Sequence, residues 1–207
     1  MLAGLLIAAA TGSGITQSGL VVRSSSEPHL AFRISDGFTS LPPLEIALPS
    51  SDVDRRIFVD ADTSGSIRRL VVLQFERVRP GSDFKFVYAP KPPYDFAGVT
   101  YRIGTYVYDD AAEAAAAPGF ESALTRKTLL AHGYDPPRLL RVMRLARVTD
   151  PGGQREVIIF YEENADAQYP DGLKGKATDA DGDLPLTGAD AKALIDRARS
   201  AIAVSPA

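Results

Sequence analysis

Alternating apolar and polar positions occupy much of the chain, and this pattern predicts β-strands. Short alternating runs lie at residues 30–35 and 44–48, on either side of the break Leu41-Pro42-Pro43. A period of two places every second side chain on the same face of a strand. We therefore expect a short strand on each side of the proline break.

A longer hairpin is predicted next. Residues 56–59 and 67–78 flank Asp60–Gly65, a stretch of Asp, Thr, Ser and Gly residues that favours a turn. In the second arm the residues from Leu70 to Leu73 are all apolar. The centre of this strand should therefore be covered on both faces.

Two further alternating runs predict strands at residues 84–88 and 99–108. Each face of the second strand should carry its own set of side chains. One face would hold Val99, Tyr101, Ile103, Thr105 and Val107, and the other Arg102, Gly104, Tyr106 and Tyr108.

Helical patterns occur in three places. Residues 111–117 are rich in alanine and follow two aspartates, and residues 121–132 end at Gly133, the usual residue after a helix. A last helix should begin near Thr187, which has capping-box-like spacing to Asp190. Its apolar positions recur with helical spacing: Ala191, Leu194, Ile195, Ala198 and Ile202.

Residues 138–148 fit either a strand or a helix. A helix would place arginines at every third position, a spacing that drifts around the axis. The turn-forming Asp150–Gly153 and the β-branched run at residues 156–161 instead favour a hairpin, so we interpret the segment as a strand.

The order of these elements indicates the fold class. Strands are followed by two helices, two strands and a final helix, without the βαβ alternation of a parallel sheet. We predict an α+β fold, an antiparallel sheet with two to three helices packed mainly on one face. The 207 residues suit one domain, here residues 27–207, with a long loop at about residues 166–186 that is rich in Gly, Asp, Lys and Pro.

Residues 1–26 are interpreted as a signal-like or flexible segment. The apolar run Leu2–Ala10 is followed by small residues, as in a secretory signal peptide, but lacks the usual positive charge before it. A periplasmic or secreted location is favoured, and a cytoplasmic one stays open. The run is too short for a transmembrane span, which takes about 20 apolar residues.

Charge and composition remove several function classes. The net charge is −3 and the basic residues are scattered among acidic ones, whereas nucleic-acid binders carry a basic stripe. We expect no nucleic acid partner. The chain has no cysteine, which excludes disulfides, thiol catalysis and cysteine-ligated zinc.

Two acidic runs resemble halves of a calcium loop. Asp60, Asp62 and Ser64 precede Gly65 with the spacing of EF-hand oxygen ligands, but position twelve is Val71 instead of glutamate. A second run has Asp179, Asp181 and Asp183. We expect no cofactor otherwise, and calcium is the ion that these runs would bind. The alternatives are a hairpin turn and a solvated loop.

Recognised catalytic motifs are missing from the sequence, since it contains no G-x-S-x-G, H-E-x-x-H or phosphate-binding loop. Strand aromatics with nearby charged groups are the remaining signal, and a ligand pocket would draw on Arg102, Tyr106, Glu76 and Glu162. The favoured function is a non-catalytic binding or accessory domain for a small amphipathic ligand or a protein partner. The alternative is a small cofactor-free enzyme that uses carboxylate, tyrosine and arginine groups.

Overall fold

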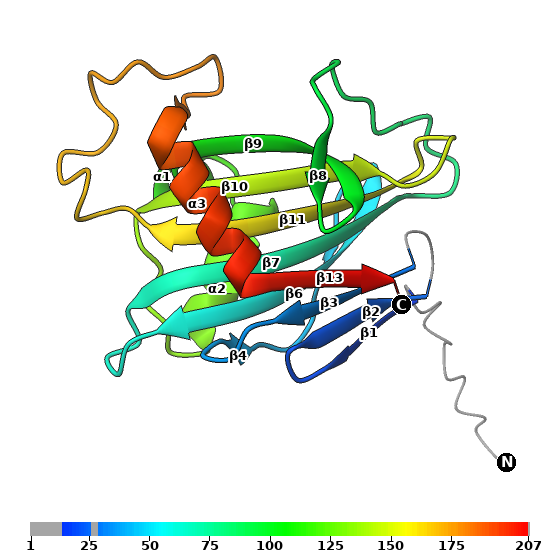
Figure 1. Cartoon of the computed structure of the whole chain (residues 1–207), viewed down its shortest axis with the longest axis horizontal. Helices are drawn as coiled ribbons and strands as arrows, with labels where there is room; N and C mark the ends of the chain where they lie inside the picture. The colour runs from blue at the N-terminus through cyan, green and yellow to red at the C-terminus, as the bar shows by residue number, and fades with distance from the viewer. Residues whose placement is uncertain (1–13, 26–28, 207) are drawn as a thin grey trace, which may run out of the picture.

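Two antiparallel sheets and three helices make up the part of the chain that the computed structural model describes, residues 14–25 and 29–206 (Figure 1). The apolar run Leu2–Ala10, interpreted above as part of a signal peptide, lies outside these residues. None of the helices in the described ranges is both long and apolar enough to span a bilayer.

The larger sheet, called the large sheet below, has the order β12-β9-β10-β11-β7-β6-β4, with β5 paired to β6 and β8 paired to β9. Its strands are β4 (Thr39–Ser40), β5 (Leu44–Ala47), β6 (Ser51–Ala61), β7 (Ile67–Val78), β8 (Tyr94–Phe96), β9 (Val99–Asp109), β10 (Leu139–Val148), β11 (Arg155–Asn164) and β12 (Leu184–Pro185).

The small sheet has the order β1-β2-β3-β13. It contains β1 (Ile15–Ser18), β2 (Val21–Ser24), β3 (Leu30–Ile34) and β13 (Ile202–Pro206), and the helices are α1 (Asp110–Ala116), α2 (Glu121–Ala131) and α3 (Gly188–Ala201). Residues 15–24, which the sequence pattern places in the signal-like segment, thus form a hairpin that pairs with β3.

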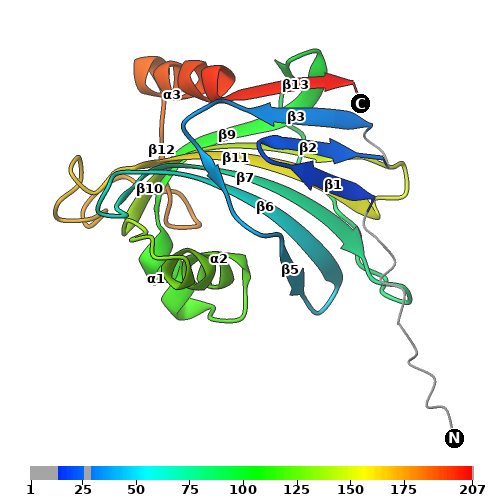
Figure 2. The ribbon, with the colours of Figure 1, turned by 90° about the horizontal axis from the view of Figure 1, so that it is seen from below.

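The elements form three layers (Figure 2). The curved large sheet is in the middle, α3 and the small sheet cover one face, and α1 and α2 cover the other. The α+β class with antiparallel sheets is confirmed. Two of the three helices, α1 and α2, lie on one face of the large sheet, and α3 lies on the other.

A separate apolar cluster lies on each face of the large sheet. Val71 and Leu73 pack with Phe32 and Leu194 under α3, while Leu70 and Val72 pack in a second cluster, with Leu129 of α2. The continuous apolar run at Leu70–Leu73 is therefore covered on both faces, as predicted, because each face has its own layer.

Most predicted elements are confirmed. The two long hairpins are β6–β7 and β10–β11, so the strand interpretation of residues 138–148 is correct. Gly133 follows α2 with a φ of 81°, a left-handed conformation that glycine adopts without strain.

The predicted strand at residues 84–88 is wrong. This segment lies between two proline-containing stretches, Arg79–Pro80 and Pro90–Pro93, and is not part of a strand. It makes a backbone hydrogen bond to the β10–β11 turn, from the Phe86 amide to the Gly153 carbonyl at 2.9 Å. Within the segment, Phe84 and Phe86 contact each other edge to face, with ring centroids 5.2 Å apart.

The last helix begins where predicted, but its cap and its end differ from the prediction. Thr187 is the N-cap residue, but its side chain makes no capping hydrogen bond. Helix α3 ends at Ala201, and Ile202 begins β13, which pairs with β3. A β-branched residue fits this strand as well as it fits the helical pattern.

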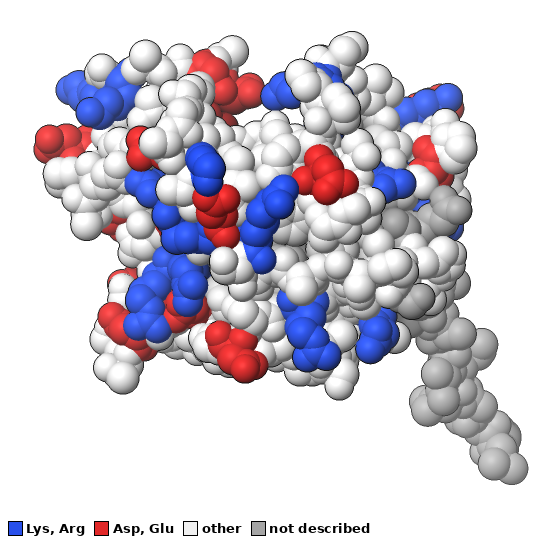
Figure 3. All heavy atoms as spheres, viewed as in Figure 1, with Lys and Arg blue, Asp and Glu red and all other residues white. Residues whose placement is uncertain are grey.

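Acidic and basic side chains are interspersed over the molecular face that carries α3 (Figure 3). One ion pair there joins α3 to β11, since Arg197 donates to Glu163 at 2.5 Å.

Candidate functional site

The strand register gathers polar side chains on the face of the large sheet under α1 and α2. One row of paired residues crosses four neighbouring strands. It consists of Leu70 on β7, Glu162 on β11, Val142 on β10 and Tyr106 on β9. Glu76 lies opposite Glu156, two residues beyond Gln74 and therefore on the same face. Strand alternation turns all these side chains toward the two helices.

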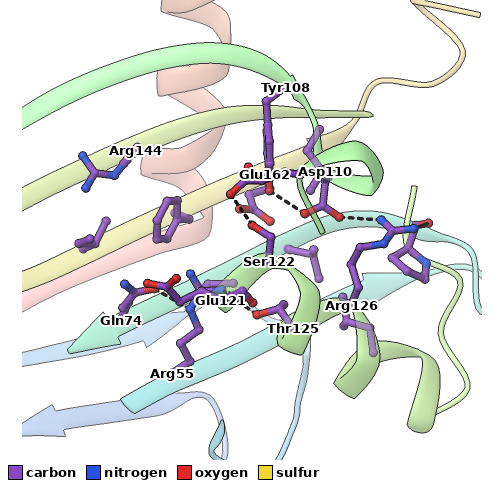
Figure 4. A pocket seen from close by; sticks show the side chains of 18 of the residues that line it. Arg55, Gln74, Tyr108, Asp110, Glu121, Ser122, Thr125, Arg126, Arg144 and Glu162 are labelled. Atoms are coloured by element: carbon purple, nitrogen blue, oxygen red, sulfur yellow. Dashed lines mark hydrogen bonds and ion pairs between the residues drawn. The ribbon is translucent and has the colours of Figure 1, made fainter. Parts of the chain in front are cut away.

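A cavity of about 300 Å³ lies between this face and the two helices (Figure 4). We call it the acidic cavity, because seven carboxyl side chains and three arginines from the described residues line it. The acids are Glu76, Asp110, Glu113, Glu121, Glu156, Glu162 and Asp183, and the arginines are Arg55, Arg126 and Arg144. Tyr106, Tyr108, Ser122 and Thr125 add hydroxyl groups.

Glu162 lies at one end of the acidic cavity, near Tyr108, Ser122 and Asp110 (Figure 4). Only 7% of Glu162 is exposed, and its carboxyl accepts no hydrogen bond from the described part of the chain. Burial, together with the nearby Asp110, raises the pKa of Glu162 to about 8.

Asp110, at the same end, is fully paired. Arg126 of α2 donates to one carboxylate oxygen at 2.6 Å, and the Tyr108 hydroxyl donates to the other at 2.9 Å. Burial raises the pKa of Asp110, while the hydrogen bond from Arg126 acts in the opposite direction. Asp110 thus joins α1, α2 and β9 at the edge of the cavity.

Arg55 of β6 lines the acidic cavity away from Asp110, beside Gln74. Its guanidinium donates to the Gln74 side chain at 2.5 Å and to the Thr125 hydroxyl at 2.6 Å, and it stacks over Phe160 at 5.7 Å. Burial lowers the pKa of Arg55. These contacts tie β6 and β7 to α2 through polar groups.

Glu76 and Glu156 are direct neighbours on adjacent strands. Like charges in opposite positions repel each other, and burial adds to that cost. Burial raises the pKa of Glu76, and burial with the nearby Glu76 raises the pKa of Glu156 to about 7. Glu156 and Glu162 are six positions apart along β11, roughly 20 Å at about 3.3 Å per residue.

Tyr88 links this carboxyl pair to an arginine. Its hydroxyl donates to Glu156 and accepts from Arg144 at 3.1 Å. The Tyr88 ring also contacts Arg102 at 5.1 Å and Arg144 at 5.6 Å from its centroid. Burial raises the pKa of Tyr88 to about 12, so the phenol stays protonated at neutral pH.

A second cavity of about 520 Å³ adjoins the first and shares Glu76, Arg144 and Glu156 with it. We call it the aromatic cavity, because it is lined mainly by Leu48, Pro49, Phe84, Phe86, Val87, Tyr88 and Phe120. Within the described ranges four large hydrophobic side chains are exposed, and three of them, Phe84, Val87 and Phe120, line this cavity.

Three of the four predicted ligand-binding residues come together. Glu76, Glu162 and Tyr106 line the acidic cavity, while Arg102 does not. Arg102 is on the same face of β9, but its guanidinium turns to the Tyr88 ring and donates to the Ala89 carbonyl.

Several cavity residues were missed by sequence reasoning, among them Arg55, Asp110 and Glu156. Arg55 lay outside the predicted strand 56–59, because β6 begins earlier, at Ser51. The sequence pattern predicts Asp110 only as an acidic residue at the start of a helix. Glu156 is within a predicted strand. Its position next to Glu76 follows only from the pairing of β11 with β7, which the local pattern does not give.

The two acidic runs have other partners. Both oxygens of Asp60 bind arginines, with Arg68 on one and Arg69 on the other. Asp62 accepts from the Ser64 amide at 2.8 Å and its hydroxyl at 2.6 Å, which stabilises the β6–β7 turn.

In the second run Asp179 likewise accepts from the amides of Asp181 and Asp183, both at 3.0 Å. No group of three or more His, Asp or Glu side chains in the described ranges is arranged to hold a metal ion.

The chain matches no protein-family model, and no curated protein or solved structure is significantly similar to it. The functional argument therefore starts from the geometry of the two cavities.

Proposed function

We propose that the protein is a non-catalytic binding domain that holds a small amphipathic organic molecule. The observation that carries this proposal is the junction of a polar cavity with an apolar one through the shared residues Glu76, Arg144 and Glu156. Polar groups of the ligand would face the acidic cavity, and its apolar part would contact Phe84, Phe86 and Phe120.

The dimensions support this proposal. Ligand pockets typically occupy about 300–1,000 Å³ and combine apolar walls with a few convergent polar groups. The two cavities, about 300 and about 520 Å³, are in this range. The roughly 20 Å between Glu156 and Glu162 along β11 favours an elongated ligand.

The energetics also favour a binding role. A buried carboxyl group that receives no hydrogen bond costs stability when it is ionised, and the described residues give Glu162 no donor. Glu76 and Glu156 add a like-charged pair. Stability alone would favour apolar residues at these positions, whereas a bound ligand gives the buried groups a partner.

Native mass spectrometry of the gently purified protein tests the proposal. We expect an added mass of a few hundred daltons on the wild-type protein, and its loss from Ser122→Trp, which fills the acidic cavity from the first turn of α2. Ser122→Ala is the matched control, because it also removes the hydrogen bond to Glu113 but leaves the cavity open. Equal retention of the added mass by Ser122→Trp would contradict the proposal.

One observation favours an enzyme as the second candidate. Arg144, Tyr88 and Glu156 form a continuous hydrogen-bonded chain, and Glu156 has a pKa of about 7, suited to general acid–base work. Native mass spectrometry of the wild type and Glu156→Gln distinguishes the two functions. If the protein is an enzyme, Glu156→Gln should carry bound substrate and the wild type bound product, which differ in mass. If it is a binding domain, both proteins should carry the same molecule.

A further inference from the structure

We propose that the molecule bound in the acidic cavity carries an ammonium group and that Glu162 is its counter-ion. The inference rests on the proposed binding function and names the chemical class of the ligand. It combines an unpartnered buried carboxyl, a local excess of acidic groups and two aromatic rings at the same end of the cavity.

Glu162 is the first observation. Its side chain lines the cavity and only 7% of the residue is exposed. The described residues provide it with no hydrogen-bond donor. The other buried carboxyls have donors. Asp110 has Arg126 and Tyr108, Glu76 has Gln74 and Ser51, and Glu156 has Tyr88.

The surrounding charge favours a cation over an anion or a neutral group. Glu162 shares its end of the cavity with three further acids, Asp110 and Glu113 of α1 and Asp183 of the loop before β12. Arg126 is already bound to Asp110 and the Pro137 carbonyl. Arg55 also attracts Glu162, but its donors are directed to Gln74, Thr125 and the Glu121 carbonyl.

Two tyrosine rings from β9 complete this end. Tyr106 and Tyr108 both line the cavity and contact each other edge to face, with centroids 6.0 Å apart. A cation over the face of an aromatic ring is attracted by the ring's negative charge density, and more strongly when it is shielded from water. An alkylammonium group therefore suits both the carboxyl and the rings.

Binding should be coupled to a proton. Burial raises the pKa of Glu162 to about 8, so this carboxyl is mostly protonated at pH 7 in the free protein. An ammonium group that takes the place of this proton binds more tightly as the pH rises toward 8. The charged and titratable groups around Glu162 are Asp110 and Glu113 of α1, Arg126 of α2, Arg55 of β6, Tyr106 and Tyr108 of β9, and Asp183 of the loop before β12.

Isothermal titration calorimetry of the full chain at pH 8 tests the inference with three probes of equal length: hexylammonium, hexanol and hexanoate. An alkylammonium keeps its charge at this pH, as lysine does. We expect hexylammonium to bind at least tenfold more tightly than the other two. Glu162→Gln should weaken hexylammonium binding at least tenfold, whereas Glu163→Gln, on the opposite face of β11, should leave it unchanged.

Equal affinity for hexanol or hexanoate, or unchanged hexylammonium binding by Glu162→Gln, would overturn the cationic ligand and leave the binding domain in place. Absence of hexylammonium binding to the wild type would also overturn it. The proposed function itself is decided separately, by the added mass on wild type and its loss from Ser122→Trp.

Discussion

Two carboxyl groups at the same end of the acidic cavity differ in whether their negative charge has a partner. Asp110 is buried between Arg126 and the Tyr108 hydroxyl, so its charge has partners. Glu162 is buried without a hydrogen-bond partner in the described part of the chain. The first residue holds α1, α2 and β9 together, and the second is the residue that we propose binds a ligand.

Glu162→Gln should stabilise the free protein, and increasingly so at high pH. The folded-state pKa of Glu162, about 8, exceeds its ordinary value, so its contribution is favourable below about pH 4.5 and is lost as the pH rises through 8. The gain in unfolding free energy should grow from near zero at pH 4.5 to on the order of 4 kcal/mol at pH 9, from 1.36 kcal/mol per pKa unit. Urea denaturation at both pH values measures it, and a pH-independent difference would contradict the assignment.

Arg126→Met should destabilise the protein by about 3 kcal/mol at pH 7, because it leaves the buried Asp110 carboxylate without its cation. The double variant Asp110→Asn with Arg126→Met should recover part of this loss. Chemical denaturation of the two variants in parallel gives the comparison. A double variant less stable than the single one would argue against a buried ion pair.

At the scale of elements, the two layers over the large sheet are attached differently. Helix α3 buries Leu194, Ala198 and Ala201, whereas α2 buries only Leu129 and Thr125. The rest of the attachment of α2 is polar, through Arg55 and Arg126. The cavity is therefore covered by the less firmly packed layer, and elements with few buried apolar contacts open more readily.

Leu129→Ala should destabilise the protein by about 2–5 kcal/mol, as expected for a buried leucine. Leu130→Ala is the matched control, because this neighbouring side chain is 59% exposed. Hydrogen exchange should be faster in α2 than in α3 in the wild type, and faster still in α2 of Leu129→Ala. Equal exchange of the two helices would contradict the difference in packing.

The elements themselves were largely predictable from local patterns. The period of two located most of the long strands, and helical spacing located the last helix, because these patterns record which side chains are buried. Alanine content and the terminal Gly133 located the first two helices. The exceptions are places where one pattern fits two structures. Phe84 and Phe86 alternate outside a strand, and Ile202 continues a helical pattern but begins β13.

The candidate site was only partly predictable. Tyr106 and Glu162 followed from strand alternation, and pairing through Val142 places them in one row. Neighbouring strands and register depend on contacts between distant residues, so the Glu76–Glu156 pair and the role of Arg55 did not follow from local pattern. Arg102 was on the expected face, but its rotation toward Tyr88 depends on a segment predicted wrongly as a strand.

For the whole molecule, the raised carboxyl pKa values predict how stability changes with pH. Burial raises the pKa of Asp183 to about 6, of Glu156 to about 7 and of Glu162 to about 8. The folded state then binds more protons than the unfolded state, and stability falls as the pH rises from about 5 to 8. Asp60 acts in the opposite direction at low pH, since its arginine partners lower its pKa against the cost of burial.

Thermal unfolding should therefore show maximal stability near pH 5 and a lower melting temperature at pH 9. Hexylammonium should restore more stability at pH 8 than at pH 5.5, because a ligand that binds the folded state through an ionised Glu162 competes with the proton. A melting temperature that rises steadily from pH 5 to pH 9 would contradict this distribution of charges.

The most direct test of the account is a ¹³C NMR titration of the Glu162 carboxyl carbon, assigned by its absence from Glu162→Gln, with and without hexylammonium. The account predicts that this carbon titrates near pH 8 in the free protein and at least one pH unit lower with the ammonium bound. A carbon that titrates at the ordinary glutamate value of about 4.3, or whose midpoint does not move with hexylammonium, would contradict it.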